Sequence, residues 1–163
     1  MLSYEFATSS HVSQLVELRI EFLTLIDGVP ADREGLAGAL RGYFAENLAN
    51  GEHVAAIALD GERIVGVAGL VYHRYPPSGD NLTGVRGHIL NVYTVATHRR
   101  RGIATRLMGM LIEYAKGHGC QRVTLHAMAE ARGIYERLGF RGIETEMRLE
   151  FPGEGSVSRD PAI

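Results

Sequence analysis

Residues 89–108 read ILNVYTVATHRRRGIATRLM, and this stretch decides the fold. Its first half belongs to the run RGHILNVYTV over 86–95, whose β-branched and aromatic residues favour a strand. Its second half opens a helix, because apolar residues recur at helical spacing at Ile103, Leu107, Met110, Leu111 and Tyr114. The sequence therefore predicts a strand that leads directly into a helix, joined by a basic turn that contains a glycine.

The turn between this strand and helix has the chemistry of an anion site. It consists of Arg99, Arg100, Arg101, Gly102, Ile103, Ala104 and Thr105. A helix N-terminus offers unpaired N–H groups and about half a positive charge. Gly102 and Ala104 lack bulk, so phosphate oxygens can approach those N–H groups, and the arginines can pair with phosphate. The spacing favours a pyrophosphate-containing ligand; a solvated basic turn that caps an ordinary helix is the alternative.

The elements on either side complete an α/β pattern. In chain order we expect a strand, two helices, three strands, a helix, a strand, a short helix and a last strand or strand pair. These cover residues 3–7, about 12–26, about 32–50, 53–72 (two strands joined at Asp60-Gly61-Glu62), 86–95, about 103–116, 122–127, 129–138 and about 140–151. The order βααβββαβαβ predicts one α/β domain with a mixed sheet over residues 1–151, followed by a flexible tail at 152–163.

Charge is unevenly distributed along the chain. The total is 17 basic against 19 acidic side chains, a formal net charge of −2. Residues 1–81 carry 5 basic and 11 acidic side chains, whereas residues 82–163 carry 12 and 8. An anion-binding half can therefore lie within a nearly neutral total. The basic residues concentrate at one junction instead of alternating with aromatic residues along a face, which argues against nucleic-acid binding.

Composition excludes several other classes. No apolar run approaches the roughly 20 residues of a membrane span, and MLSYEFATSS lacks the features of a secretory signal. Cys120 is the single cysteine, which excludes an internal disulfide and fits a cytoplasmic setting. The seven histidines lack the spacing of metal ligands. We therefore expect a cytoplasmic protein with neither a metal nor a membrane partner.

Two motifs in sequence register resemble the GCN5-related N-acetyltransferase (GNAT) superfamily. Residues 89–108 look like its acyl-CoA-binding motif R/Q-x-x-G-x-G/A, with Arg99, Gly102 and Ala104 at the three defined positions. Residues 125–140, LHAMAEARGIYERLGF, are similar to its next motif, which Arg132, Tyr135, Gly139 and Phe140 match. The similarity covers about residues 3–150.

The resemblance implies both a geometry and an activity. The central strand of the mostly antiparallel sheet would carry a bulge and splay from its neighbour, leaving backbone groups of Val92, Tyr93 and Thr94 free to bind pantetheine. The pyrophosphate of acetyl-CoA, the co-substrate, would lie against Arg99 to Thr105. The implied reaction is direct transfer of the acetyl group to a primary amine of a small molecule or peptide. A non-catalytic acyl-CoA sensor and a protein N-terminal or lysine acetyltransferase remain alternatives, and a homodimer is compatible with the family.

The resemblance also points to catalytic residues. Tyr135 matches the superfamily's general acid, since a protonated tyrosine can donate to the departing thiolate; the other interpretation is a packing tyrosine. His88 on the central strand is the candidate base, because an imidazole has a suitable pKa. The rivals for the role of base stay open: His73, His126, Glu21 and Asn91.

Overall fold

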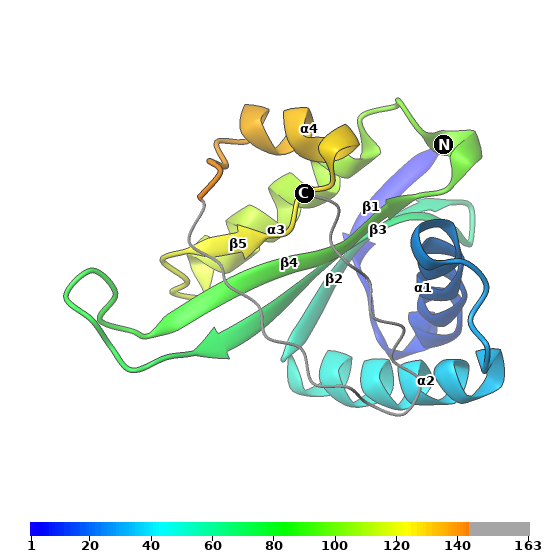
Figure 1. The fold of residues 1–163 in the computed structure, drawn as a ribbon, viewed down its shortest axis with the longest axis horizontal. Coiled ribbons are helices and arrows are strands. Elements are labelled where there is room, and N and C mark those ends of the chain that lie inside the picture. Colours follow the sequence, from blue (N-terminus) through cyan, green and yellow to red (C-terminus); the bar gives the residue numbers. More distant parts are fainter. Residues whose placement is uncertain (144–163) are drawn as a thin grey trace.

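The computed structural model describes residues 1–143 and shows the expected α/β fold (Figure 1). The strands are β1 Leu2–Phe6, β2 His53–Asp60, β3 Arg63–Arg74, β4 Val85–Thr94 and β5 Val123–Leu125. The helices are α1 Val12–Asp27, α2 Arg33–Asn50, α3 Ile103–Gly117 and α4 Arg132–Arg137. Of the last strand expected at 140–151, residues 140–143 have no regular structure, and the rest lies outside the described residues, as does the tail at 152–163.

Residues 1–143 form a five-stranded sheet in the order β1-β2-β3-β4-β5. The first three pairings are antiparallel and only β4–β5 is parallel, which confirms the mixed, mostly antiparallel sheet. Helices α1 and α2 lie on one face, and α3 and α4 lie on the other (Figure 1). Because β2 and most of β3 are buried on both faces, they are continuous apolar runs without alternation.

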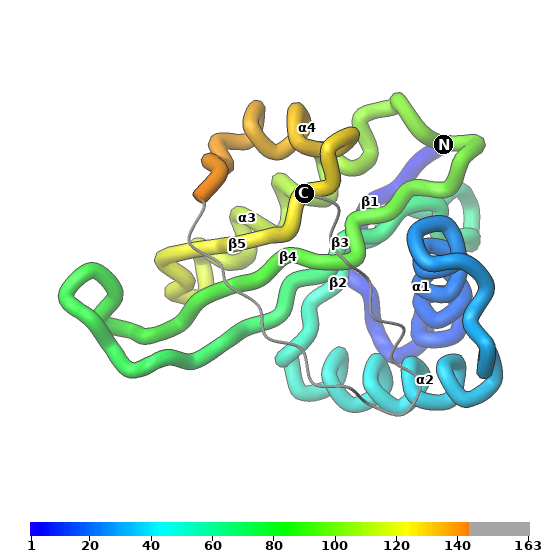
Figure 2. The backbone as a smooth tube through the Cα atoms, in the orientation of Figure 1, coloured from blue at the N-terminus to red at the C-terminus, as the bar shows by residue number. Residues whose placement is uncertain are grey.

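Strands β4 and β5 pair only briefly before they separate. The parallel register covers three residue pairs, from Gly87–Val123 to Ile89–Leu125. Strand β5 then turns toward α4 while β4 continues along the sheet (Figure 2). This separation explains why β5 ends at Leu125 instead of reaching residue 127: beyond that point β4 is no longer beside it. The splay that the resemblance implied is therefore present.

The backbone of β4 is irregular just beyond the point of separation. Val67 pairs with Tyr93 and Gly69 with Leu90, so Ala68 faces two residues of β4 instead of one. Asn91, one of those two, has a φ of 53°, a left-handed conformation that asparagine tolerates better than most residues. The register shift and this φ together identify a β-bulge at Asn91–Val92.

Helix α3 lies close against the centre of the sheet. Leu107, Met108 and Leu111 on its inner face are completely buried. A Cβ atom on Gly66 of β3 would lie 2.6 Å from Cγ2 of Ile103, so the first turn of α3 approaches the sheet at a position where only glycine fits. This contact fixes the N-terminus of α3 near the end of β4.

Candidate active site

The junction between β4 and α3 is shaped by two residues in the left-handed conformation. Arg100 has a φ of 60° and Gly102 a φ of 75°, and Gly102 is the N-cap residue of α3. Left-handed residues within a turn allow successive backbone N–H groups to converge on one side, which creates a concavity for an anion. For a non-glycine residue such as Arg100 this conformation costs about 1 kcal/mol or more, and such strain is concentrated at functional sites.

The N-terminus of α3 differs from that of α2 in its capping. In α2 the side chain of Asp32 accepts a hydrogen bond from the N–H of Gly35 at 2.8 Å. At α3 no side chain of the described residues caps the helix, and its first turn contains no acidic residue. The N–H groups of Ile103, Ala104 and Thr105 consequently lack helical or side-chain acceptors and carry the positive end of a 15-residue helix.

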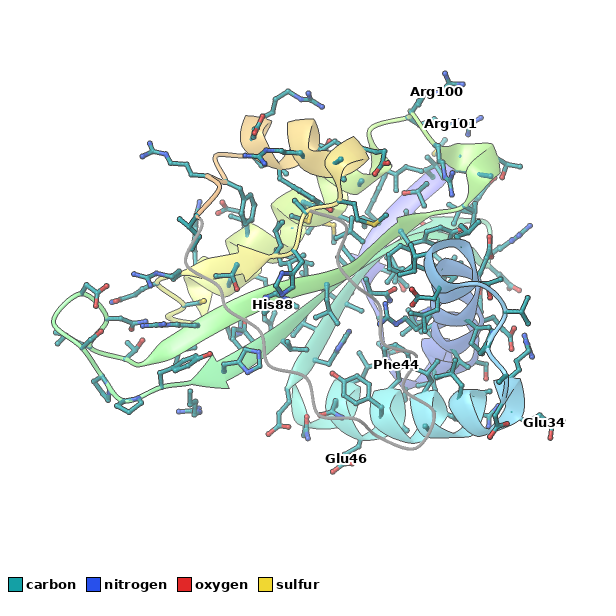
Figure 3. The ribbon with its side chains drawn as sticks, viewed as in Figure 1. Glu34, Phe44, Glu46, His88, Arg100 and Arg101 are labelled. Carbon is teal, nitrogen blue, oxygen red and sulfur yellow. The ribbon has the colours of Figure 1, made fainter. Side chains whose placement is uncertain are left out.

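The three arginines of the turn do not act alike. The guanidinium of Arg99 folds back, where its Nε donates to the carbonyl of Thr94 at 3.0 Å and its Cζ lies 5.8 Å from the centroid of the Tyr93 ring. Arg100 and Arg101 are exposed, and their side chains extend outward from the loop (Figure 3). Arg99 thus stabilises the backbone at the C-terminal end of β4. The charges of Arg100 and Arg101 are available to a ligand.

Beyond Ile89, the edge of β4 that faces β5 has no strand partner among residues 1–143. This edge includes Val92 and Tyr93 just after the bulge. Unpaired backbone polar groups cost free energy unless a ligand or water satisfies them. The side chain of Tyr93 has a different task on the α1 face, where its hydroxyl donates to Oε1 of Glu21 at 2.6 Å and its ring lies 5.5 Å from that of Phe22.

Tyr135 lies on α4, on the same side of the sheet as α3. The residue is only 8% exposed. Its ring packs edge-on against that of Phe140, with 6.2 Å between the ring centroids. Burial raises the pKa of Tyr135 above the ordinary value for tyrosine. Within residues 1–143, no hydrogen bond engages the hydroxyl.

His88 lies on β4 before the bulge, at the last part of the strand that still pairs with β5. Its Nδ1 is 2.9 Å from Oγ1 of Thr124, and its ring lies 5.1 Å from that of His126 and 6.4 Å from that of His73. The candidate His88 and the two rival histidines, His73 and His126, therefore form one group. Figure 3 shows His88 well apart from Arg100 and Arg101. Three residues separate it from Val92, and the four residue steps correspond to roughly 13 Å along an extended strand.

Asn91 and His53 line a cavity that the sequence does not reveal. The cavity has a volume of about 230 Å³, and its walls come from α1, α2, β2 and the bulge of β4. Its lining comprises Arg19, Leu40, Tyr43, Phe44, His53, Leu90 and Asn91. His53 Nε2 and Asn91 Oδ1 are buried and have no hydrogen-bond partner within the described part of the chain. This cavity reaches the bulge from the α1–α2 face.

Comparisons with known proteins agree with this geometry. The sequence profile of the Acetyltransferase (GNAT) family matches residues 14–140. The chain therefore belongs to the GNAT acetyltransferase family. Within residues 1–143, no group of three or more histidine, cysteine or acidic residues is arranged to hold a metal, and no helix is long and apolar enough to cross a membrane.

Individual relatives are named for different acceptors. Glucosamine 6-phosphate N-acetyltransferase 1 of Oryza sativa is 29% identical over 142 residues, which cover 85% of this chain and 84% of the relative. N-alpha-acetyltransferase MAK3 of Arabidopsis thaliana is 37% identical over 65 residues, which cover only 38% of this chain and 34% of the relative. A predicted acetyltransferase from Clostridium acetobutylicum, solved with acetyl-CoA, is 30% identical with a TM-score of 0.82 and covers 92% of this chain and 96% of its own.

Proposed function

We propose that this protein is an acetyl-CoA-dependent N-acetyltransferase that transfers the acetyl group directly to a primary amine. The observation that carries the proposal is the uncapped N-terminus of α3, preceded by the left-handed Arg100 and Gly102 and set beside the open edge of β4. Family membership and a structural relative solved with acetyl-CoA support it.

The two open features match the two ends of the co-substrate. The N–H groups from Arg100 to Thr105 hold the pyrophosphate, because the helix dipole and the exposed guanidinium groups of Arg100 and Arg101 favour its negative charge. The unpaired edge of β4 at Val92, Tyr93 and Thr94 binds pantetheine through its backbone. Since the carbonyl of Thr94 already accepts from Arg99, the remaining backbone groups of this segment supply the contacts.

The reaction requires no covalent intermediate. The lone pair of a neutral amine attacks the thioester carbonyl, so that a C–N bond forms and the carbonyl π electrons move to oxygen. A backbone N–H near the bulge stabilises this oxyanion. The intermediate then collapses, the C–S bond breaks, and the electron pair leaves with sulfur. The amine releases one proton and the thiolate gains one, giving an amide and free CoA.

Tyr135 supplies the proton to sulfur in this proposal. Because burial raises its pKa, it stays protonated at neutral pH and can donate. His88 remains the candidate base, and its separation from the bulge means that ordered water would have to carry the proton from the amine. Its hydrogen bond with Thr124 fixes the ring for that role.

The proposal predicts release of free CoA thiol from acetyl-CoA in the presence of an amine. The full chain is incubated with acetyl-CoA and a panel of primary amines, and thiol release is followed together with the thermal shift caused by acetyl-CoA. We expect a thermal shift and amine-dependent thiol release. A thermal shift without release for any small amine or peptide N-terminus would support the sensor alternative and contradict the enzyme proposal.

A further inference from the structure

Two cavities flank α1. The polar groups of the first have hydrogen-bond or ion-pair partners, whereas the second contains polar atoms without a partner among residues 1–143. The first, of about 310 Å³, is lined by Glu17, Glu21 and Arg33 among others. Its charged groups already have partners: Glu17 pairs with Arg33 at 2.6 Å, and Glu21 accepts from Tyr93. A ligand entering this cavity would have to compete with these contacts, so it is the less suitable site.

The second cavity, which contains Asn91, has polar atoms that lack partners. His53 is 2% exposed and Asn91 6%, and within residues 1–143 neither His53 Nε2 nor Asn91 Oδ1 has a hydrogen-bond partner. Leaving a buried polar atom unpaired costs free energy, and native proteins rarely keep such atoms without a reason. A bound molecule that donates to Asn91 Oδ1 and contacts His53 would satisfy both atoms.

The position of His53 depends on the adjoining strand. A Cβ atom on Gly69 of β3 would lie 2.9 Å from both Cε1 and Nε2 of His53, so the absence of a side chain there lets the imidazole reach the bulge. Its other nitrogen, Nδ1, is 3.1 Å from the hydroxyl of Tyr43. Burial, assisted by the charge of Arg19, lowers the pKa of His53 to about 4, so the ring is neutral at physiological pH.

Arg19 gives this cavity a positive charge. No aspartate or glutamate is among its lining residues, and no ion pair to Arg19 is present within the described part of the chain. The guanidinium lies 5.7 Å from the centroid of the Phe22 ring, a contact that leaves its N–H donors available. Asp27 acts electrostatically on Arg19 and favours its charge, but no carboxylate lines the cavity itself. The partly buried guanidinium is therefore suited to the carboxylate or phosphate of a ligand.

We infer that the cavity at Asn91 binds the acceptor, and that the acceptor is a small amine carrying an anionic group. The anionic group pairs with Arg19, and the amine donates to Asn91 Oδ1 beside the bulge where the acetyl group is presented. This inference rests on the proposed function, because it names the substrate class of the same site. A volume of about 230 Å³ is large enough for a small amine.

The test compares amines that differ in their negative charge. Thiol release from acetyl-CoA is measured for glucosamine 6-phosphate against glucosamine, and for 4-aminobutyrate against butylamine, so that phosphate and carboxylate are separated. We expect kcat/KM to be at least about 10-fold higher for the anionic member of one pair. Arg19→Gln should remove that preference without changing the affinity for acetyl-CoA, whereas Arg41→Gln, an exposed arginine on α2, should preserve it.

Binding of the same four amines in the presence of CoA, followed by NMR, separates the two proposals. Turnover with no preference for the anionic amines, or a preference that survives Arg19→Gln, would overturn the inference and leave the N-acetyltransferase proposal intact. Arg19-dependent binding of an anionic amine without turnover would support the cavity assignment and contradict the enzyme. Absence of both binding and turnover for the anionic amines would overturn the inference.

Discussion

Ala104→Glu is expected to weaken acetyl-CoA binding by roughly 100-fold or more while the protein remains folded. Ala104 is in the first turn of α3, where the structure leaves N–H groups without a side-chain cap. A carboxylate at this position interacts favourably with the positive end of the helix dipole, so it should not destabilise the helix. The same carboxylate repels a pyrophosphate, and like charges placed together cost several kcal/mol. Titration calorimetry with acetyl-CoA and thermal unfolding measure the two effects separately.

The matched control for Ala104→Glu is Ala45→Glu. Ala45 is an exposed alanine within α2, so this variant makes the same change in composition and net charge away from the junction. It should bind acetyl-CoA with the wild-type affinity. If both variants bound acetyl-CoA as tightly as the wild type, the N-terminus of α3 would not be the pyrophosphate site.

Tyr135→Phe is expected to lower kcat by about 10-fold or more with little change in the affinity for acetyl-CoA. The substitution removes only the hydroxyl and keeps the ring that packs against Phe140. Steady-state kinetics on the best amine of the panel, together with calorimetry, measure both quantities. The edge-on contact with Phe140 should persist, so thermal stability should be nearly unchanged.

The pH dependence of kcat gives an independent check on Tyr135. Burial raises its pKa, so the protonated, donating form persists beyond pH ~10, the ordinary pKa of a tyrosine. We therefore expect no loss of kcat from this residue on the alkaline side until above that pH. If Tyr135→Phe had the same kcat as the wild type, Tyr135 would have no part in the mechanism and would be a packing residue.

The sequence predicts the architecture well because each element has a strong local signal. The apolar residues of α3 recur at helical spacing, and β2 and β3 are apolar runs separated by Gly61 and Glu62. The basic turn can also be predicted from local sequence, because the end of the strand, the turn and the start of the helix are consecutive in the chain. Family membership, expected from two motifs, is confirmed by the match over residues 14–140.

Other features depend on contacts between distant segments, which a single sequence does not show. Strand β5 is shorter than predicted because its neighbour diverges, not because of its own residues. The cavity beside the bulge forms where His53 approaches Gly69, 16 positions away in the sequence, and α2 supplies Tyr43. One local signal was available: an asparagine amid β-branched and aromatic residues is unfavourable in a regular strand and marks the bulge.

The roles of the three arginine side chains in the turn also depend on contacts that the sequence does not show. From the sequence, Arg99, Arg100 and Arg101 are predicted to form one basic group that faces a pyrophosphate. The structure directs the Arg99 guanidinium to the Thr94 carbonyl and the Tyr93 ring, so its side chain organises the turn. All three arginines are exposed, but Arg100 and Arg101 have no such contacts among residues 1–143. Which member of a charged run contacts the rest of the protein depends on the path of the backbone, which the sequence alone does not show.

Hydrogen exchange of the backbone amides with and without CoA tests the central claim most directly. If the turn before α3 holds the pyrophosphate and the open edge of β4 holds pantetheine, CoA should slow exchange at residues 100–105 and 92–94. Exchange in α2 should be unaffected. Binding of CoA that leaves both segments unprotected, or that protects only α1 and α2, would contradict the assignment of the acyl-CoA site.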